Sequence, residues 1–493
     1  MPMERLSNID TAWLRMEGAS HPMMITMAMT FGAPLDLGRL KATFDERLLQ
    51  FRRFRQRVIQ PEQPHARYYW QNDPGFDLDV HLQTVSLRSP GDEAALRDLI
   101  SELTSTQLDL SRPLWQFHLV EQYGEGWALV GRVHHCLADG PALLHVLVTM
   151  AETASGDQPA ATGSAQVQGP EDRSLAIASL EATIRATEAM AREGAKIMRN
   201  PMRLFSLAHL GRGSTRALSK LLLRPPDPKT AFRGKLGTEK RVAWSVPIPL
   251  RDVRATGRLV DGTVNDVMLA AITGGLRRYL QSCGERVDGL CIRTGLSVNL
   301  RSPEEEIGLG NHAGAFLVSL PIGVAHPLDR LSEIKRAMDA LKSSPEGTMV
   351  YGLLNALGMA PAEIQQELVA SYCTRETAMT ANVPGPAERL NLAGAPLDML
   401  MFWVPAFGGV GLNLNIVSYA GQIRLGVASD RGLVPHPERI IDEFLVELDA
   451  LRALADEPEA ESADGAVSED PFEALSAMLD DAARTLDEIL EDT

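Results

Sequence analysis

Two adjacent histidines, an aspartate and a glycine stand within seven residues of this 493-residue chain, as His134-His135-Cys136-Leu137-Ala138-Asp139-Gly140. A neutral imidazole held in a turn beside a carboxylate suits general-base catalysis near neutral pH. With 11 His and 40 Gly in the chain, chance would produce HHxxxxG only about 0.02 times, a small false-positive risk for a motif. The alternative is a pair of core histidines beside a helix-capping Asp139, but capping explains neither histidine.

The residues around the motif predict what holds it in place. Trp127–Val133 is apolar and rich in β-branched residues, which indicates a buried strand. Ala142–Met150 repeats apolar residues at helical spacing, Pro141 suits the first position of that helix, and Gly140 suits a tight turn. The histidines are therefore expected on a strand-to-helix turn, the kind of loop on a rigid frame where active sites are often found.

The rest of the chain mixes strand and helix patterns without a steady βαβ rhythm, so an α/β fold with mixed sheets is expected. Its length exceeds one ordinary core, which makes two domains the default. We expect an N-terminal domain at 1–152, a linker and basic helical crossover at 153–238, a second domain at 239–454, and an acidic linker with an amphipathic tail helix at 455–493.

The strands and helices expected in these domains follow from hydrophobic periodicity. Strands are expected at Met23–Phe31, Trp115–Glu121, Gly126–His134, Arg241–Val246, Leu290–Val298, Ala313–Leu320, Leu397–Val404, Leu412–Ser418 and Gln422–Ala428. Helices are expected at Leu37–Phe51, Glu93–Leu108, Ser174–Arg199, Thr263–Tyr279 and Pro437–Leu454. The start of the helix at Thr263 resembles a capping box with Asp266 as its acidic member.

Charge is unevenly distributed along the chain, whose formal net charge is −16. Residues 456–493 hold 14 Asp/Glu against one arginine, a balance of −13, whereas residues 192–241 hold 13 Lys/Arg against three acids, a balance of +10. No base-reading motif accompanies the basic region, so nucleic acid is not an expected partner. A phosphorylated cofactor or an anionic membrane fits this charge better, with Ile197–Leu210 as the candidate membrane contact.

Cellular location is suggested by what the sequence lacks. The four cysteines show no CxxC spacing, which fits a reducing cytoplasm better than a disulfide framework or a zinc ribbon. The first residues show no signal-peptide pattern, and no apolar run of about 18 residues is present to span a bilayer. We therefore expect a cytoplasmic protein.

Several elements together carry a family resemblance. HHxxxDG after a strand resembles the acyltransferase superfamily that includes chloramphenicol acetyltransferase, carnitine acyltransferases and peptide-synthetase condensation domains. The match is narrowed to the bacterial wax ester synthase/diacylglycerol acyltransferase family by further elements in family order: Leu6-Ser7-Asn8-Ile9-Asp10, Arg112-Pro113-Leu114-Trp115, Asn265-Asp266, Asn382-Val383-Pro384-Gly385-Pro386 and Gly411-Leu412-Asn413-Leu414-Asn415-Ile416. Departures are Ala381, the segment Thr230–Gly234 in place of an Asn-Gly turn, and the acidic tail.

The resemblance implies two chloramphenicol acetyltransferase-like domains with an active-site channel at their interface. Acyl-coenzyme A would be the co-substrate, with no metal and no permanently bound cofactor. His135 matches the catalytic histidine, a base toward the alcohol and then an acid toward the departing thiol. His134 would shape the turn that Gly140 belongs to. Asp139 would hold the loop through an ion pair, for which Arg301 is the candidate partner.

Other residues keep two interpretations. Asn265, followed by Asp266, either faces His135 and the oxyanion or bonds within the start of its own helix. Cys136 is an alternative nucleophile, with His135 as its activating base. Substrate contact competes with a core position for Pro113 and Trp115, and with a rigid turn for Asn382, Pro384 and Gly385. His118, His145 and His312 are expected to be ordinary structural or surface histidines.

Three functions remain in competition. The first is acyl-coenzyme A-dependent esterification of a long-chain alcohol or diacylglycerol, by an enzyme attached peripherally to the inner membrane or to lipid inclusions. The second is an HHxxxDG acyltransferase with another acceptor, which would predict a carrier-protein module or partner. The third is a non-catalytic lipid-surface protein of the same fold, which intact His135 and Asp139 argue against. No pattern in the sequence indicates an oligomeric state.

Overall fold

The protein is described from a computed structural model over residues 3–60, 68–153, 224–301, 308–342, 344, 346–360 and 362–456. The helix expected at Ser174–Arg199, the segment Ile197–Leu210 and the tail from residue 457 onward lie outside these described residues. Within them, the expected α/β class with mixed sheets is confirmed. No helix in the described ranges has the length and apolar character needed to cross a bilayer.

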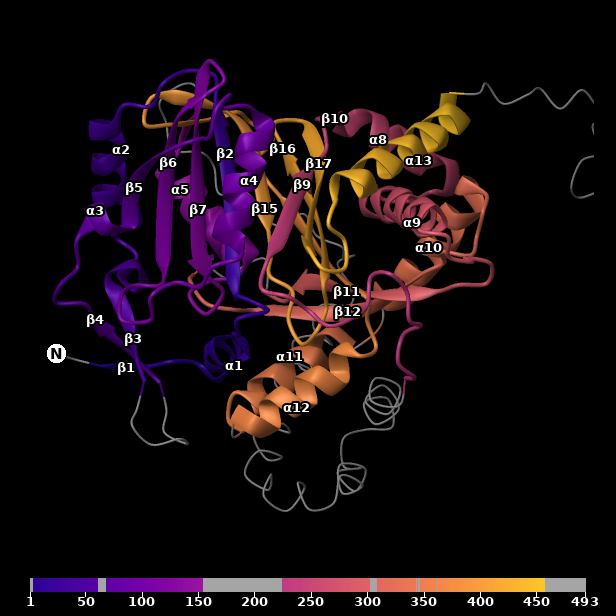
Figure 1. The fold of residues 1–493 in the computed structure, drawn as a ribbon, viewed down its shortest axis with the longest axis horizontal. Helices are drawn as coiled ribbons and strands as arrows, with labels where there is room; N and C mark the ends of the chain where they lie inside the picture. Colours follow the sequence, from indigo (N-terminus) through magenta and orange to yellow (C-terminus); the bar gives the residue numbers. More distant parts are fainter. Residues whose placement is uncertain are drawn as a thin grey trace, which may run out of the picture. The chain divides into compact units, whose positions relative to one another are not determined.

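The first large sheet has seven strands, and two of them come from the C-terminal half of the chain (Figure 1). Strand β2 lies centrally with all eight residues buried, as expected for a strand covered on both faces. Strands β14 and β15, which we call the exchanged strands, come from the C-terminal half and extend this sheet beyond β2. The first sheet therefore contains strands from both halves of the chain. In order the strands are β5 (Leu82–Ser86), β6 (Trp115–Tyr123), β7 (Gly126–His134), β2 (Met24–Phe31), β15 (Ala395–Trp403), β14 (Leu390–Leu392) and β8 (Glu152–Thr153).

The second large sheet is formed entirely by the C-terminal half. Its strands run in the order β10 (Ile248–Pro249), β17 (Gln422–Asp430), β16 (Leu412–Tyr419), β13 (Ala378–Pro384), β11 (Ile292–Asn299) and β12 (Ala313–Leu320), with β9 (Lys240–Trp244) also paired to β17. Four helices gather beside this sheet in Figure 1: α8 (Leu250–Gly257), α9 (Val264–Ser282), α10 (Pro327–Lys342) and α13 (Glu438–Asp456). Gly275 lets α9 approach α13, because a Cβ there would lie 2.8 Å from the Phe444 nitrogen.

The remaining helices surround the region where the two sheets meet. Helix α4 (Glu93–Thr104) contacts β2 and β7 of the first sheet and β9 of the second. Helix α1 (Asn8–Met16) packs against the pair α11 (Glu346–Leu357) and α12 (Ala362–Cys373). The other elements of the N-terminal half are α2 (Leu37–Thr43), α3 (Leu78–His81), the largely buried α5 (Gly140–Met150) and a small sheet of β1 (Glu4–Arg5), β4 (Tyr69–Asn72) and β3 (Gln56–Ile59).

Tertiary contacts alter several boundaries expected from periodicity. The helix expected at Glu93–Leu108 ends at Thr104. At this point Arg132 Nη1 donates hydrogen bonds to the carbonyl oxygens of Leu103 and Thr106, at 2.8 and 3.0 Å. The helix expected at Leu37–Phe51 is α2 followed by a π-helical turn at Phe44–Leu48. The NVPGP element is not simply a turn, because Asn382 to Pro384 complete strand β13 and pair with β16. Helices α1, α3, α8, α10, α11 and α12 were not expected.

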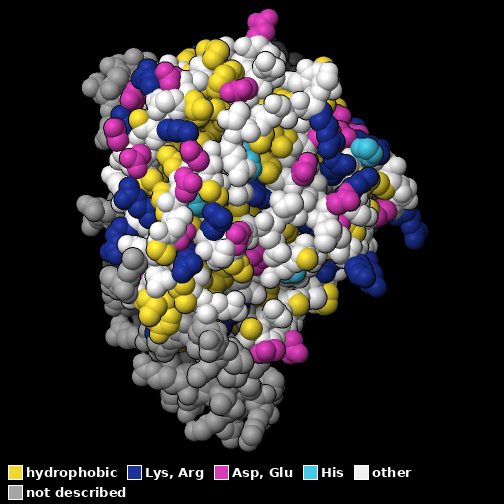
Figure 2. All heavy atoms as spheres, turned by 60° about the vertical axis from the view of Figure 1, so that its left-hand side comes forward, with side chains coloured by type: hydrophobic (Ala, Val, Ile, Leu, Met, Phe, Trp, Pro, Cys, Tyr) yellow, Lys and Arg dark blue, Asp and Glu magenta, His cyan; other side chains and the backbone are white. Residues whose placement is uncertain are grey.

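Surface charge on the face drawn in Figure 2 is mixed. Lys/Arg and Asp/Glu side chains are interspersed there with hydrophobic ones. Such interspersion gives no strong field of one sign over the part of the chain visible in that view.

Candidate active site

The HHxxxDG motif occupies a strand-to-helix turn, as its flanks predict. His134 is the last residue of β7 and pairs with Met24 of β2. The His135 nitrogen donates to the Met23 carbonyl at 2.8 Å, which fixes the backbone at the first residue beyond the strand. Asp139 caps α5 by accepting from the Ala142 nitrogen at 3.1 Å. The turn is thus tied to the sheet at one end and to a helix at the other.

Asp139 also forms the ion pair that holds the two halves of the chain together at this point. Arg301 Nη1 lies 2.9 and 2.8 Å from the two Asp139 carboxylate oxygens, and the side chains are 3% and 2% exposed. The His312 nitrogen donates to Asp139 Oδ2 at 2.8 Å, and Arg301 Nη2 donates to the Gly310 carbonyl at 2.9 Å. Because Arg301 follows strand β11, the pair ties the HHxxxDG turn to the second sheet.

His135 is held by side chains from both halves. Its ring stacks on Trp13 of α1 with centroids 4.0 Å apart, and Phe407 meets Trp13 edge-on. Its Nδ1 lies 2.8 Å from Asn311 Oδ1. Burial lowers the pKa of His135, with the Asp139 charge opposing this effect. The imidazole is therefore neutral near pH 7, the protonation state that a general base requires.

His134 and Cys136 occupy structural positions. The Cys136 nitrogen donates to His134 Nδ1 at 3.0 Å, while His134 Nε2 faces Glu17 Oε2 at 3.8 Å. Burial and the neighbouring His135 lower the pKa of His134 to about 3. Burial raises the pKa of the Cys136 thiol well above its usual value. Since the thiolate is the nucleophilic form, this environment disfavours the covalent alternative.

The ND and NVPGP elements meet near the same turn. Asn265 lies in the first turn of α9 and is 8% exposed, and Asn382 Nδ2 approaches its Oδ1 at 3.4 Å. Val383, next to Asn382, lies close to Gly140 of the motif, because a Cβ built on Gly140 would be 3.7 Å from the Val383 side chain. Asp266 forms the expected capping box, accepting from the Thr263 nitrogen at 2.7 Å. This contact explains Asp266 as a helix cap, whereas the role of Asn265 toward an oxyanion stays a prediction.

Trp115 belongs to an aromatic cluster inside the N-terminal half. It is fully buried, its Nε1 donates to the Phe54 carbonyl at 2.8 Å, and its ring stacks on His81 with centroids 4.4 Å apart. Pro113, just before it, is buried. These contacts favour a core position, and a role in the acyl passage stays a prediction.

The Gly385 nitrogen donates to the Ser418 carbonyl at 2.8 Å, and a Cβ on Gly385 would lie 2.4 Å from that oxygen.

The other three histidines singled out have different surroundings. Burial lowers the pKa of His118 to about 4, and His145 meets Phe51 edge-on at 6.1 Å. His312 contributes its backbone nitrogen, which donates to Asp139, and this is compatible with the structural role expected for it.

Sequence reasoning assigned no role to the side chains around His135, namely Trp13 and Asn311, which contact its ring, and Asp10, which contacts Asn311. Trp13 and Asp10 lie on α1, whose start coincides with the familial Leu6–Asp10 element, so a signal for them was present. Asn311 lies between β11 and β12, and no motif marked it. Two asparagines of the Gly411–Ile416 element also have a visible role: Asn413 and Asn415 of β16 bond to Val404, which follows the exchanged strand β15. They thereby connect the two sheets.

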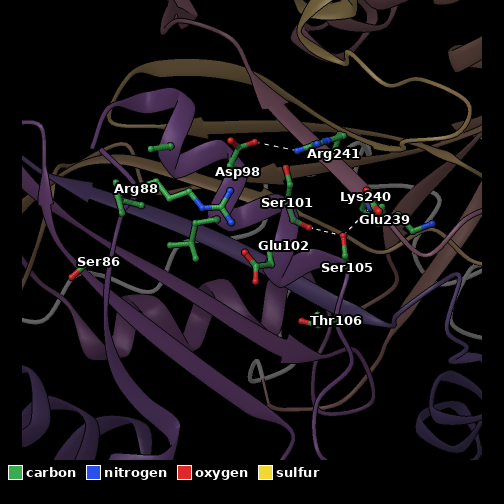
Figure 3. Close-up of a pocket in the computed structure, with 13 residues that line it drawn as sticks. Ser86, Arg88, Asp98, Ser101, Glu102, Ser105, Thr106, Glu239, Lys240 and Arg241 are labelled. Atoms are coloured by element: carbon green, nitrogen blue, oxygen red, sulfur yellow. Dashed lines mark hydrogen bonds and ion pairs between the residues drawn. The ribbon is translucent and has the colours of Figure 1, made fainter. Parts of the chain in front are cut away.

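A pocket of about 410 Å³ lies away from the motif, between α4 and β9 (Figure 3). Two of its charged side chains, Arg241 and Asp98, pair with each other at 3.1 Å, and the Lys240 backbone nitrogen donates to Ser105 Oγ at 2.7 Å. A second pocket shares Lys240 and reaches Met24, whose backbone pairs with His134. The chemistry of the motif therefore does not coincide with the larger pocket.

The fold and the site define a class of protein. The HHxxxDG motif lies, with His135 buried, where an ion pair joins the two mixed sheets, and this is the motif on which the resemblance to acyltransferases rests. The family model for the wax ester synthase/diacylglycerol acyltransferase catalytic domain matches residues 6–268, and that for the WS/DGAT C-terminal domain matches residues 309–452. The chain belongs to the wax ester synthase/diacylglycerol acyltransferase family and is an acyltransferase.

Individual relatives agree over most of the chain. It is 26% identical to the probable diacylglycerol O-acyltransferase tgs1 of Mycobacterium tuberculosis, covering 88% of this chain and 92% of that protein. It is 28% identical to tgs2 of the same species, over 89% and 96%. Among solved structures, the Marinobacter aquaeolei wax ester synthase/diacylglycerol acyltransferase is similar with a TM-score of 0.64 at 23% identity, covering 92% and 99%. The first condensation domain of the calcium-dependent antibiotic synthetase gives 0.58 at 16%, covering 93% and 97%.

Proposed function

We propose that this acyltransferase moves a long-chain acyl group from acyl-coenzyme A to the hydroxyl of a diacylglycerol or a fatty alcohol, with His135 as the general base. The observation that supports this most directly is the buried, neutral His135 imidazole on a turn fixed by Asp139 and Arg301. A thioester is already activated, so the protein must chiefly deprotonate the alcohol and stabilise the oxyanion.

The proposed reaction has two steps, addition of the alcohol to the thioester carbonyl and elimination of coenzyme A. The alcohol oxygen attacks the thioester carbonyl carbon while its proton passes to a ring nitrogen of His135. The tetrahedral intermediate then collapses, the carbon–sulfur bond breaks, and the imidazolium returns the proton to the departing coenzyme A sulfur. The products are an ester and free coenzyme A. Asn265, buried at the start of α9, is the proposed polar group facing the oxyanion, a role usually filled by a preorganised donor.

A direct assay tests this function. Purified protein is given palmitoyl-coenzyme A with either hexadecanol or dipalmitoylglycerol, and thiol release is followed together with the ester product. His135→Ala is expected to lose about 10²–10⁴-fold in rate, the usual contribution of a positioned base. His134→Ala is expected to lose less, because His134 only shapes the turn. Near-full activity of His135→Ala would overturn the mechanism, and transfer to neither alcohol would overturn the acceptor class.

We further propose that the enzyme works attached peripherally to the inner membrane or to lipid inclusions. The reasons are the very apolar acceptors and the +10 balance of residues 192–241, since each Lys/Arg near an anionic surface adds about 1 kcal/mol of attraction. Co-sedimentation with anionic vesicles tests this. Charge reversal at Arg199 and Arg203 is expected to weaken binding, and truncation after Ala455 to strengthen it by removing the acidic tail. Equal binding of all three proteins would mean that neither segment governs membrane contact, and absence of binding by the wild-type protein would refute peripheral attachment.

A further inference from the structure

We propose that Asn311 and Asp10 are positioning residues for the reaction. Together they hold the His135 imidazole with its proton on Nδ1, so that the Nε2 lone pair is the one available to the acceptor hydroxyl. This inference rests on the proposed function of His135 as the base. It adds two residues, from opposite halves of the chain, that determine which ring nitrogen acts.

The contacts form a continuous chain of hydrogen bonds. Asp10 Oδ1 accepts from Asn311 Nδ2 at 2.8 Å, and Asn311 Oδ1 lies 2.8 Å from His135 Nδ1. The same Nδ2 donates to the backbone carbonyl of His135, also at 2.8 Å. All three side chains are buried, with exposed fractions of 6% for Asp10, 5% for Asn311 and 4% for His135.

The orientation of the Asn311 amide follows from its partners. Two acceptor oxygens, from Asp10 and from the His135 backbone, lie on one side of it. Only the NH₂ group, with its two donors, satisfies both; the reversed amide would place oxygen against two oxygens in a buried site, which is costly. The amide oxygen must therefore face His135 Nδ1.

The ring tautomer follows from that orientation. An amide oxygen has no proton to give, so the bond to Asn311 exists only if His135 Nδ1 carries the hydrogen. A neutral imidazole carries one ring proton, which leaves Nε2 as the free acceptor. The mechanism needs such an acceptor. In proteins, the hydrogen bond made by one ring nitrogen usually determines which of the two histidine nitrogens carries the proton.

Asp10 is itself fixed by local structure. The Ser7 hydroxyl caps α1 by accepting from the Asp10 nitrogen at 3.0 Å. The helix is also anchored to α12, because Gln365 Nε2 donates to the Ala12 carbonyl at 2.7 Å. One short helix thus presents both the Trp13 ring that stacks on His135 and the carboxyl group that orients Asn311.

Charged and titratable groups face His135 from each element around it. Asp10 lies on α1, His134 precedes it on β7, and Asp139 caps α5, where Arg301 of the second half neutralises it. Asp139, a hydrogen bond of the ring to the backbone of His135 itself, and the bond to Asn311 all oppose the lowering of the His135 pKa by burial. Removing the Asn311 amide is therefore expected to lower the pKa of His135 further, and an acidic side chain in its place to raise it.

The first test is kinetic. Asn311→Ala is expected to reduce kcat by roughly ten- to a hundredfold, since it removes the side-chain acceptor of the His135 ring proton and the donor that satisfies the buried Asp10 carboxylate. KM should change little, and the acidic limb of the kcat/KM profile should move to lower pH. The double variant Asn311→Asp with Asp10→Asn exchanges carboxylate and amide, so Nδ1 keeps an acceptor. It should recover part of kcat and move the acidic limb to higher pH.

A matched control separates this role from general packing. Asn8 also lies on α1, and its Nδ2 donates to Asn355 Oδ1 at 3.2 Å without contacting His135. Asn8→Ala removes a hydrogen bond from the same helix and should leave both the pH profile and kcat within about twofold. If Asn8→Ala shifted the acidic limb as Asn311→Ala does, the assignment of Asn311 and Asp10 would be wrong.

The second test does not depend on activity. Nitrogen NMR of ¹⁵N-histidine-labelled wild-type protein near pH 7 should show a protonated Nδ1 and an unprotonated Nε2 for the signal that His135→Ala removes. The reverse pattern would overturn the inference, even if Asn311→Ala failed to fold. If wild-type protein released no thiol but showed the expected pattern, the proposed function would fail while the tautomer assignment stood. If the Asn311→Ala variant kept the kcat, the acidic limb of the pH profile and the His135 tautomer of the wild-type protein, the positioning role of Asn311 and Asp10 would be refuted while the proposed function stood.

Discussion

The ion pair between Asp139 and Arg301 allows a quantitative prediction. Asp139→Ala should destabilise the protein by about 3–5 kcal/mol, the usual cost of leaving one member of a buried pair without its partner. Arg301 would remain buried with two N–H groups that lose the contacts of 2.9 and 2.8 Å. The variant also loses the cap on the Ala142 nitrogen, typically worth about 1 kcal/mol.

Another aspartate provides a matched control for the cap. Asp92 caps α4 in the same way, accepting from the Ala95 nitrogen at 3.0 Å, but it is exposed. Asp92→Ala should therefore cost about 1 kcal/mol. The difference between Asp139→Ala and Asp92→Ala reports the buried contacts that Asp139 makes beyond the cap, the ion pair with Arg301 and the bond from the His312 nitrogen. Asp139→Asn keeps an oxygen for the cap and should lie between the two values.

Urea unfolding of the single and double variants measures the pairing directly. Arg301→Ala alone should also be strongly destabilising, because it strands the Asp139 carboxylate. The double variant Asp139→Ala with Arg301→Ala should cost clearly less than the sum of the single changes, since no uncompensated charge remains. Thiol release should fall in all three, because the turn carrying His135 loses its anchor. Additive costs, or an Asp139→Ala protein with wild-type stability and rate, would refute the structural role.

Three further predictions follow from buried groups near the site. Cys136→Ala should keep most activity and no acyl-cysteine should appear in mass spectra, because burial raises the pKa of this thiol; a trapped acyl-enzyme would contradict this. The pKa of His134 falls from 6.5 unfolded to about 3 folded, so lowering the pH from 6.5 toward 3 should cost about 1.4 kcal/mol per unit through this group; urea unfolding of His134→Asn should show a correspondingly shallower decline, and an unchanged slope would count against the assignment. Gly358→Ala should lower both stability and activity, because its Cβ would lie 1.6 Å from the Asn8 carbonyl of α1, and overpacking costs about 1–3 kcal/mol; Gly308→Ala, with open space around it, is the control expected to resemble wild type.

Sequence reasoning succeeded where the information is local. Gly126–His134 and Ala313–Leu320 are strands with the predicted limits, because uninterrupted apolar runs with turn residues at each end leave little choice of structure. The capping box at Thr263 was visible because all of its partners lie within four residues. The turn bearing His135 was predictable for the same reason.

The limits of sequence reasoning lie in contacts between distant parts of the chain. Nothing local predicts that β15 leaves the C-terminal half to pair with β2, so that Trp403 lies opposite Thr26. Asn311 carries no periodic or motif signal, since its role depends on a side chain 176 positions away. Helix α1 was missed because nine residues carry a weak pattern, although the familial element at its start marked the place.

The site's architecture explains why these distant contacts matter for catalysis. The first half of the chain supplies His135, the proposed base, on a turn, and the second half supplies Arg301 and Asn311, which hold that turn and its imidazole. Neither Arg301 nor Asn311 can hold the turn and the imidazole of His135 unless the two sheets are assembled. Because β14 and β15 belong to the C-terminal half of the chain but pair within the first sheet, that sheet is complete only when the two halves are docked. Catalytic competence is therefore coupled to docking of the halves, and changes at the junction should reduce kcat before they unfold either sheet.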